Sequence, residues 1–360
     1  MAEFKQYNLP EEAEGEQSNI VYIGDSSVVK EGSLKSPNYV KGQVGWSINS
    51  DGTAEFQGLV IGGVVQTSKG TFGGDGSDGA LTVSANIDID ALTVNYVVKN
   101  YETLTINAGN TLGLTNPATN GTILHIKVQG DVTINGSINL QGDGAAGGTA
   151  GASGGGASSA GSNMDLRWSD TTNQFGGAVG VSVGAGGGGG GGAHKTVGTA
   201  GTVGGGGGSA GGAAGTVLSL FTSNVNPNIF KNIRAICGAG GGGGGGGQNN
   251  AGGAGGRGGG VFILECGGDL TFGSASTINV GGADGSAGGA AGNSGGGGGG
   301  AGSGGQSLIL YNGTLTDSGV TVTVTGGTGG AGGNAIIEDG GAGGNGGNGD
   351  SIMAVNNAFA

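Results

Sequence analysis

Glycine makes up 98 of the 360 residues, and parts of the chain repeat it in strict Gly-Gly-X triplets. Ala251 to Gly259 reads AGG-AGG-RGG, Gly326 to Asn334 reads GGT-GGA-GGN, and Gly340 to Asn348 reads GGA-GGN-GGN. A period of three predicts a left-handed extended helix with three residues per turn, in which every X lies along one edge. The bare edges let neighbouring helices approach and hydrogen-bond through their main chains. We therefore interpret these runs as folded; a disordered Gly-rich spacer is the alternative.

Acidic side chains outnumber basic ones by 25 to 12, which gives a formal net charge of −13. Phosphate binding requires clustered Lys and Arg, so this balance argues against nucleic acid and against an anionic membrane as partners. No apolar run approaches the roughly 18 residues of a spanning helix, so we expect no membrane insertion. Only 34% of residues are hydrophobic and 5% aromatic. Any large aliphatic core is therefore confined to part of the chain.

The N-terminal segment MAEFKQYNLPEEAEGEQ is acidic and has neither the basic nor the apolar region of a signal peptide. We therefore expect no secretion signal and a chain that is made and folded in a cytosol. Cys237 and Cys266 are too few for a disulfide framework. We expect both to be reduced and buried.

The composition divides the chain into three zones: residues 1–70, residues 71–144, and a Gly-rich zone at residues 145–360. In the first zone Trp46 and Ile48 alternate with polar residues, and the alternation restarts at Ala54 and Phe56 after Asn49-Ser50-Asp51-Gly52. Alternation on both sides of an Asp-Gly turn predicts a β-hairpin.

The second zone is rich in Thr, Val, Ile and Asn, and its last segment is repeated further along the chain. The three copies read GDVTINGSINLQGDG from residue 130, GGDLTFGSASTINVGGADG from residue 267 and NGTLTDSGVTVTVTGGTGG from residue 312. Each copy follows a short apolar strand (ILHIKV, VFILEC or SLILY) and precedes a Gly-rich excursion. Such repeats indicate stacked units that bury their apolar faces on their neighbours. A β-solenoid and a small β-sandwich both fit, and we favour the first.

The expected fold is thus mostly β, with little or no α-helix. A solenoid-like or sandwich-like spine carries polyglycine-II-like helices as long insertions. Within the spine, Leu92, Val94 and Tyr96 are expected to share one face of a strand. Further along, Leu124, Ile126 and Val128 alternate with Ile123, His125 and Lys127, so the two sets face opposite ways.

Four islands interrupt the Gly-rich zone, and they hold most of its large polar and aromatic side chains. They are Asn163 to Phe175, Ala193 to Val197, Val217 to Cys237 and Ala335 to Asp339. The first contains Arg167, Trp168, Asp170 and Phe175 close together. The second contains His194 next to Lys195.

Residues that carry chemistry are scarce. We expect His125 to be an exposed strand residue, and His194 has no neighbouring nucleophile or carboxylate motif. No HExxH or CxxC sequence occurs. The segment GGDGSDG from residue 73 fits part of a calcium-binding nonapeptide, but a single copy favours a polar turn. We therefore predict no catalytic, cofactor-binding or metal site, and no enzyme.

Two features resemble bacteriophage tail proteins. The segment from Ser36 to Gly63, with its Gly-Trp-x-Ile, Asp-Gly and Glu-Phe strings, is similar to a module that precedes a receptor-facing region in such proteins. The alternation of islands and glycine runs resembles the tip adhesins of T-even-like phages, where loops between glycine helices contact the host receptor. This chain departs from that pattern, because its glycine runs are irregular between Gly147 and Gly215 and a solenoid-like spine precedes them.

The resemblance implies a tail-fibre or tail-tip protein of a virion, made in the host cytoplasm, that binds an outer-membrane protein or a glycan on a bacterial surface. Loops on a rigid scaffold commonly carry binding, and Trp, Tyr and Arg are common anchors. We therefore predict receptor binding by Arg167, Trp168, Asp170 and Phe175, with His194 and Lys195 next. Packing of Trp168 beneath its own loop is the alternative for that residue.

Two other functions fit parts of the sequence. A self-assembling extracellular fibre would use bare glycine edges to pair with other chains. An ice-binding protein would need Thr or Ala at successive X positions, whereas Thr clusters in the strands here. If the chain is a tail protein, the N-terminal zone is expected to attach to other tail proteins. We favour a homotrimer over a monomer on a trimeric fibre, because symmetric homo-oligomers are the general expectation.

Overall fold

The computed structural model describes residues 72–153, 161, 180, 186–205, 209–215 and 237–356, together with three short strands near the N-terminus. Contacts divide the chain into two units, Met1–Thr67 and Ser68–Ala360. The predicted zones 71–144 and 145–360 therefore lie within one unit. The described residues form strands, turns and extended segments, without α-helix.

The first unit contains the predicted hairpin. Its strands are β1 (Ser33–Lys35), β2 (Trp46–Asn49) and β3 (Ala54–Phe56), which form an antiparallel sheet. Trp46 pairs with Phe56, and Ile48 pairs with Ala54. This register confirms the predicted hairpin pairing.

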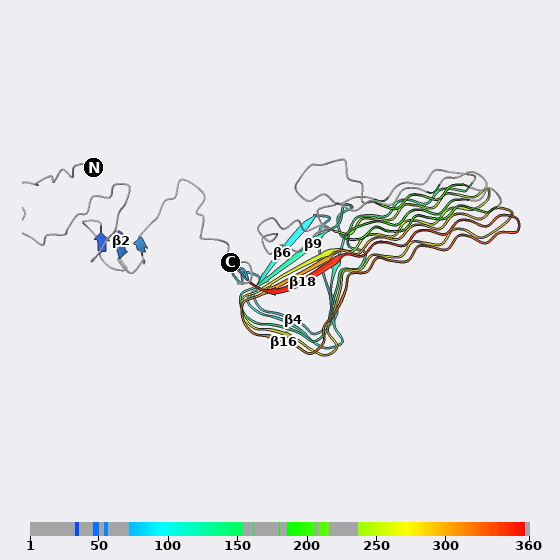
Figure 1. Cartoon of the computed structure of the whole chain (residues 1–360). Helices are drawn as coiled ribbons and strands as arrows, with labels where there is room; N and C mark the ends of the chain where they lie inside the picture. Colours follow the sequence, from blue (N-terminus) through cyan, green and yellow to red (C-terminus); the bar gives the residue numbers. More distant parts are fainter. Residues whose placement is uncertain are drawn as a thin grey trace, which may run out of the picture. The chain divides into compact units, whose positions relative to one another are not determined.

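The second unit contains a spine of three parallel five-stranded sheets, arranged as stacked coils (Figure 1). Each coil contributes one strand to every sheet, which gives a solenoid-like architecture. The first two coils consist of β4 (Leu81–Val83), β5 (Ile87–Asp90) and β6 (Tyr96–Tyr101), then β7 (Leu104–Ile106), β8 (Thr111–Thr115) and β9 (Ile123–Val128). The third and fourth consist of β10 (Val132–Ile134), β11 (Ser137–Asn139) and β12 (Val261–Cys266), then β13 (Leu270–Phe272), β14 (Thr277–Asn279) and β15 (Gln306–Tyr311). The last consists of β16 (Leu315–Asp317), β17 (Thr321–Thr323) and β18 (Asp350–Val355).

The sequence repeats coincide with the coils. Val132 pairs with Leu270, and Leu270 with Leu315, so equivalent positions of the three predicted copies are stacked in register. Two further coils precede these copies. The sequence repeats do not include these two coils, because only short connections follow β5 and β8, where the later coils have Gly-rich excursions.

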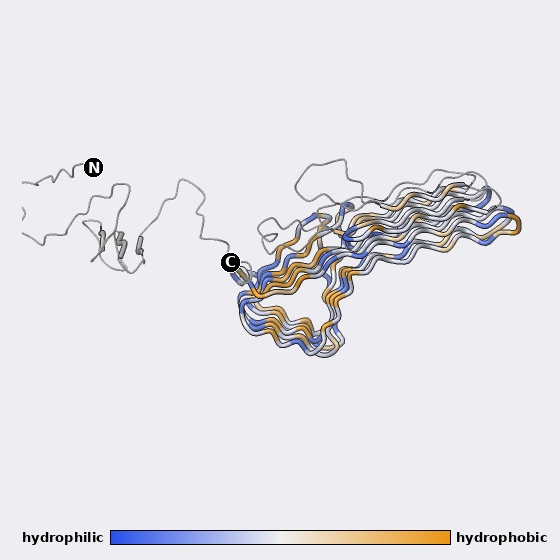
Figure 2. Tube along the Cα trace, viewed as in Figure 1, coloured by the Kyte–Doolittle hydropathy of each residue, from blue (hydrophilic) through white to orange (hydrophobic). Residues whose placement is uncertain are grey.

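Aliphatic and aromatic side chains fill the inside of the coils. Leu124, Ile126 and Val128 of β9 are fully buried there, together with Phe262 and Phe272. Ile123 belongs to a second, smaller cluster with Val261 and Ile263, which confirms that the two sets of β9 face opposite ways. Figure 2 shows hydrophobic residues concentrated along the spine strands, in contrast to the weakly coloured Gly-rich segments.

The strand expected around Leu92 is wrong. Leu92 and Thr93 have φ values of 49° and 59°, and Leu92 N donates to Asp90 Oδ1 over 2.9 Å. This Asx-type contact makes a turn in which the Leu92 side chain is 71% exposed. β6 begins only at Tyr96.

The Gly-rich excursions all leave the spine at the same corner. They lie between β11 and β12, between β14 and β15, and between β17 and β18. We call their described Gly-rich segments the glycine bundle: residues 144–153, 186–205, 209–215, 238–260, 281–305 and 326–349. The segments run side by side away from the spine (Figure 1). We call the end next to the spine the base, and the opposite end the tip.

Main-chain hydrogen bonds join the segments of the bundle at every third residue. The amides of Gly238, Gly241 and Gly244 donate to the carbonyls of Gly259, Gly256 and Gly253 over 2.8–2.9 Å. This pair is antiparallel, whereas Gly295, Gly298 and Ala301 bind Glu338, Gly341 and Gly344 in a parallel pair. The main-chain groups of a segment with almost no side chains are satisfied in this way.

Three segments form the centre of the bundle: 186–192, 238–247 and 295–305. Gly242 N donates to Gly190 O, Gly300 N to Gly242 O, and Gly189 N to Gly298 O, so each of the three segments contacts the other two. All of their residues are buried. A Cβ at Gly300 would overlap the carbonyl oxygen of Gly190. Glycine is therefore required at nearly every position of these runs.

The outer segments keep glycine only where a neighbour approaches. In the last segment Gly341, Gly344 and Gly347 are buried, while Ala342, Asn345 and Asn348 are exposed. Gly-Gly-X triplets are thus found in outer segments of the bundle, and the longer glycine runs are found in its central segments. Among the described segments, the regularity of the glycine spacing thus differs with the layer that the segment occupies.

Side chains near the base bind the bundle to the spine. Arg257 donates to the carbonyls of Gly142, Ala118 and Gly144 over 2.7–3.0 Å. These contacts join the start of the first excursion to the connection between β8 and β9. Burial raises the pKa of the neighbouring Asp143 carboxyl to about 7, against the opposing charge of Arg257 and with a small contribution from Asp88.

The raised pKa of Asp143 predicts a loss of stability with rising pH. A carboxyl whose pKa is higher in the folded chain stabilises the fold below its unfolded pKa of 3.8, and this stabilisation is lost as pH rises through about 7. Between these values, wild type should lose up to about 1.4 kcal/mol per pH unit relative to Asp143→Asn. Urea unfolding of both proteins at pH 5 and pH 7.5 measures this difference. Parallel pH profiles would contradict it.

The two cysteines are free and buried, as expected. Cys237 Sγ donates to Thr122 O over 3.3 Å, at the place where the bundle meets the outer face of β9. Burial raises the pKa of the Cys266 thiol to about 11 and shifts that of Cys237 further in the same direction. Both thiols therefore remain protonated at neutral pH and act as small apolar side chains.

Candidate functional site

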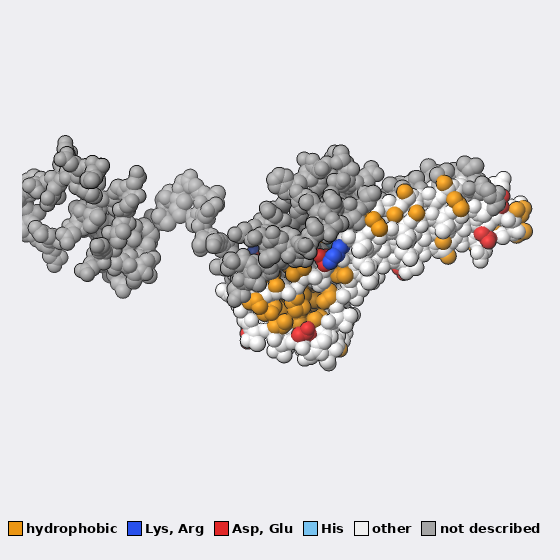
Figure 3. Space-filling view, in the orientation of Figure 1, with side chains coloured by type: hydrophobic (Ala, Val, Ile, Leu, Met, Phe, Trp, Pro, Cys, Tyr) orange, Lys and Arg blue, Asp and Glu red, His pale blue; other side chains and the backbone are white. Residues whose placement is uncertain are grey.

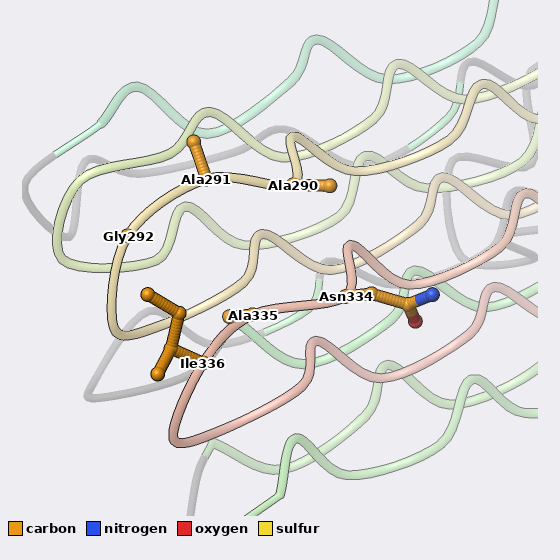
Figure 4. Close-up of a pocket in the computed structure, with 6 residues that line it drawn as sticks. All are labelled: Ala290, Ala291, Gly292, Asn334, Ala335 and Ile336. Atoms are coloured by element: carbon orange, nitrogen blue, oxygen red, sulfur yellow. The ribbon is translucent and has the colours of Figure 1, made fainter.

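Three turns lie together at the tip of the glycine bundle: Gln248 to Asn250, Ala291 to Ser294, and Asn334 to Asp339. At each turn the chain reverses direction between the two arms of a hairpin. The hydrogen bonds Gly247 N to Asn250 O, Gly296 N to Gly289 O and Gly340 N to Gly333 O join these arms. We call these three turns the tip surface. Figure 4 shows the second and third turns side by side.

The third turn carries two adjacent, highly exposed aliphatic side chains. Ile336 is 82% exposed and Ile337 is 68% exposed. Figure 3 shows hydrophobic side chains gathered at the far end of the bundle, with acidic side chains close by. The two adjacent side chains leave aliphatic area exposed to water, which makes this turn a candidate contact surface.

A shallow hollow of about 240 Å³ lies between the second and third turns. Its lining is mostly small and apolar, from Ala290, Ala291, Gly292, Asn334, Ala335 and Ile336. In Figure 4 the Ile336 side chain extends from the third turn toward Gly292 on the second. The hollow is large enough for one side chain of a partner, not for a drug-sized ligand.

Two carboxylates follow the isoleucines in sequence. Asp339 Oδ1 accepts a hydrogen bond from Ala335 N over 2.8 Å, which closes the third turn on itself. Glu338 is partly exposed, and its main chain forms a parallel bridge with Ser294 of the second turn. The tip surface therefore combines an aliphatic pair with negative charge.

Of the residues predicted to bind a receptor, four lie outside the described residues: Arg167, Trp168, Asp170 and Phe175. The other two, His194 and Lys195, lie at the base of the bundle. His194 is 4% exposed. Lys195 Nζ lies 2.7 Å from Asp350 Oδ1 at the start of β18. The structure thus places this pair beside the spine and not on the tip surface.

Sequence reasoning recorded the island Ala335 to Asp339 but did not select Ile336 and Ile337. The signal was present, because two β-branched apolar residues stand between glycine triplets that contain no other large apolar side chain. The prediction favours aromatic and basic residues instead, because these are common anchors of interfaces. In a bundle whose chains are nearly bare, however, an exposed aliphatic pair is itself unusual.

A second polar cluster lies on the outer face of the sheet that contains β9. Tyr96 Oη lies 2.6 Å from His125 Nδ1, and His125 Nε2 lies 3.0 Å from Glu265 Oε1. Lys127 Nζ lies 3.3 Å from Glu265 Oε2. The expectation that His125 is exposed is wrong, because it is 8% exposed and joins three strands.

The cluster also fixes the chain segment that leads into the spine. Gly73 N donates to Glu265 Oε2 over 3.1 Å. Burial alone raises the pKa of the Glu265 carboxyl, but the hydrogen bond and charge of His125, the Gly73 amide and Lys127 together hold it below its usual value. We interpret this cluster as a structural tie between the entering segment and the coils.

The segment GGDGSDG forms turns near this tie. Asp75 Oδ1 accepts from Ser77 N over 3.1 Å, and Asp78 Oδ2 accepts from Asn100 N over 2.7 Å. Among the residues that the structure describes, no three His, Cys, Asp or Glu side chains form a group that could hold a metal ion.

Comparison with family models, with characterised proteins and with solved structures finds no match for this chain. Within the described part of the chain, no helix has the length and hydrophobicity to cross a membrane.

Proposed function

We propose that this protein is a phage tail-fibre or tail-tip protein that attaches the virion to a bacterial surface receptor through the tip surface. The observation that carries this proposal is the exposed pair Ile336 and Ile337 at the end of a bundle built largely of glycine. Binding residues commonly stand on turns that a rigid scaffold positions. A partner that covers the two isoleucines would bury aliphatic area and gain affinity from it.

The glycine bundle supplies the scaffold in this proposal. We propose that its segments are polyglycine-II-like helices, supported by main-chain hydrogen bonds at every third residue. Such helices can carry turns outward without a large hydrophobic core. The same reasoning leaves the receptor-binding role of Arg167, Trp168, Asp170 and Phe175 as a prediction.

The remaining assignments follow from the tail resemblance. We propose that the N-terminal zone binds other tail proteins and that the chain forms a homotrimer, with a location in the virion. The receptor is an outer-membrane protein or a glycan. The proposed activity is binding and not catalysis.

The bundle geometry bears on the fibre alternative. Bare glycine edges would have to face outward for lateral pairing between chains. In the described outer segments the glycines instead face neighbouring segments, and the exposed positions carry side chains such as Ala342 and Asn345. This arrangement favours a bundle whose glycine edges are already paired within the chain over one that pairs with further chains. We therefore rank the fibre second.

One expectation about the ice-binding alternative is corrected. Thr196, Thr199 and Thr202 do occupy successive exposed positions of one segment, so Thr is not confined to the strands. Their hydroxyl oxygens accept hydrogen bonds from the amides of Asn348, Asn345 and Ala342, each over 2.7 Å. These hydroxyls therefore serve packing within the bundle, and this row does not raise the rank of ice binding.

Binding of the purified protein to a panel of bacterial strains tests the proposal. The double variant Ile336→Ser/Ile337→Ser should bind a responding strain at least about tenfold more weakly, because tenfold corresponds to only 1.4 kcal/mol of lost contact. The matched control is Val197→Ser, which removes an apolar side chain of 61% exposure near the base. A variant without Asn163 to Phe175 tests the predicted loop in the same assay.

Two results would overturn the proposal. One is equal loss of binding in the tip variant and the base variant. The other is absence of binding to every strain together with filaments in electron micrographs, which would favour the structural fibre.

A further inference from the structure

A single buried asparagine at the tip contacts both ends of the neighbouring turn. Asn250 is only 7% exposed, although it belongs to the first turn of the tip surface. Its Nδ2 donates to Ser294 O over 2.8 Å and also to Ala291 O. One amide group therefore holds the first and last residues of the second turn.

The second turn in turn holds the third. Ile336 N donates to Gly292 O over 2.9 Å, and Glu338 N donates to Asn293 O over 3.0 Å. In the opposite direction, Gly295 N donates to Glu338 O over 2.8 Å. The main-chain positions on both sides of Ile337 are thus set by the turn that Asn250 holds.

A fourth segment, which ends at Gly205, contacts the third turn as well. Gly205 N donates to Asp339 O over 2.7 Å. The third turn is therefore fixed at Ile336 and Glu338 by one neighbour and at Asp339 by another. The turns come from separate excursions, so no local sequence preference could fix their relative positions.

We propose that Asn250 is a positioning residue that makes the three turns a single binding surface, an inference that rests on the proposed function. Asn250 itself is buried and offers little surface to a partner. It acts through the second turn on the placement of Ile336 and Ile337. A short side-chain amide suits this role, because its Nδ2 group supplies two N–H donors for the two carbonyl oxygens.

Asn250→Asp is the sharpest test, because it keeps the size of the side chain and removes both donors. A carboxylate there would face two carbonyl oxygens and leave them unsatisfied. The matched control is Asn249→Asp, which adds the same charge to an exposed position of the same turn. Asn250→Ala removes the donors without adding charge, so it keeps the test valid if Asn250→Asp fails to fold.

Two readouts separate this inference from the proposed function. The first is the methyl NMR spectrum of the isoleucines in the full chain, without any receptor. We expect the Ile336 and Ile337 signals to move in both Asn250 variants and to stay in place in Asn249→Asp. The second is binding to a responding strain, which should weaken at least about tenfold in the Asn250 variants only, a change of 1.4 kcal/mol.

Unchanged Ile336 and Ile337 signals in the Asn250 variants would overturn the inference, whatever the binding result. Equal loss of binding in Asn249→Asp and Asn250→Asp would also overturn it, because charge alone would then explain the loss. If the methyl signals move as expected but wild type binds no strain, the positioning role stands and the proposed function fails.

Discussion

Gly300→Ala should destabilise the glycine bundle by about 3 kcal/mol or more, at the upper end of what overpacking costs. The added Cβ would overlap the carbonyl oxygen of Gly190, and that oxygen belongs to a central segment enclosed by other main chains. Gly300 also donates to Gly242 O and accepts from Gly256 N, both over 2.8 Å. Moving the chain to relieve the overlap would therefore break hydrogen bonds on two further sides.

Denaturant unfolding measures this effect, with Ala331→Val as the matched control. Ala331 is exposed at an X position, so its larger replacement should change the free energy of unfolding by no more than about 0.5 kcal/mol. Similar free energies of unfolding for the two variants would contradict the layered bundle. They would instead indicate that the Gly-rich zone is a spacer without fixed packing.

Phe272→Ala should cost about 3–5 kcal/mol, because it removes a large, fully buried aromatic side chain. Phe272 lies on β13, where it pairs with Ile134 of the preceding coil and Asp317 of the following one. Coils on both sides are held in register, so they cannot easily collapse into the cavity. Thermal and denaturant unfolding report the loss.

The control for Phe272→Ala is Val98→Ala on β6. Val98 is 37% exposed on the outer side of its strand, so its truncation should cost well under 1 kcal/mol. Equal losses in the two variants would show that the coils are not packed around Phe272 as described.

Local patterns predicted the elements of this fold well. The Asp-Gly dipeptide between Ile48 and Ala54 was enough for the hairpin, because a two-stranded unit is set by its own turn. The three related segments predicted stacked coils, since coils at equivalent positions need the same alternation of inward and outward residues. The first two coils were missed because short connections stand where the later coils have long Gly-rich excursions.

The layers of the bundle could not be read from triplets alone. A strict Gly-Gly-X pattern indicates a segment with one free side, and a continuous glycine run such as 240–247 indicates a segment with none. This distinction depends on which segments are neighbours, and hydrogen bonds such as Gly297 N to Gly245 O join residues that are far apart in the sequence.

The tip surface could not be predicted either, because it also depends on which segments are neighbours. Asn250, Gly292 and Ile336 lie on three separate hairpins and meet only when the bundle is assembled. His194 and Lys195 were predicted to bind because they are polar residues in a glycine loop. That loop reverses the chain at the base and not at the tip. Successive turns of an excursion lie alternately at the tip and at the base, so the lengths of the hairpins decide at which end a loop lies.

Site-specific photocrosslinking to whole cells tests the central claim most directly. A photoreactive residue at position 337 should give a covalent adduct with a surface macromolecule of a responding strain, whereas the same residue at position 197 should give none. That pattern is what an adhesive tip predicts. Adducts from position 197 without adducts from position 337 would place the contact at the base and contradict the account.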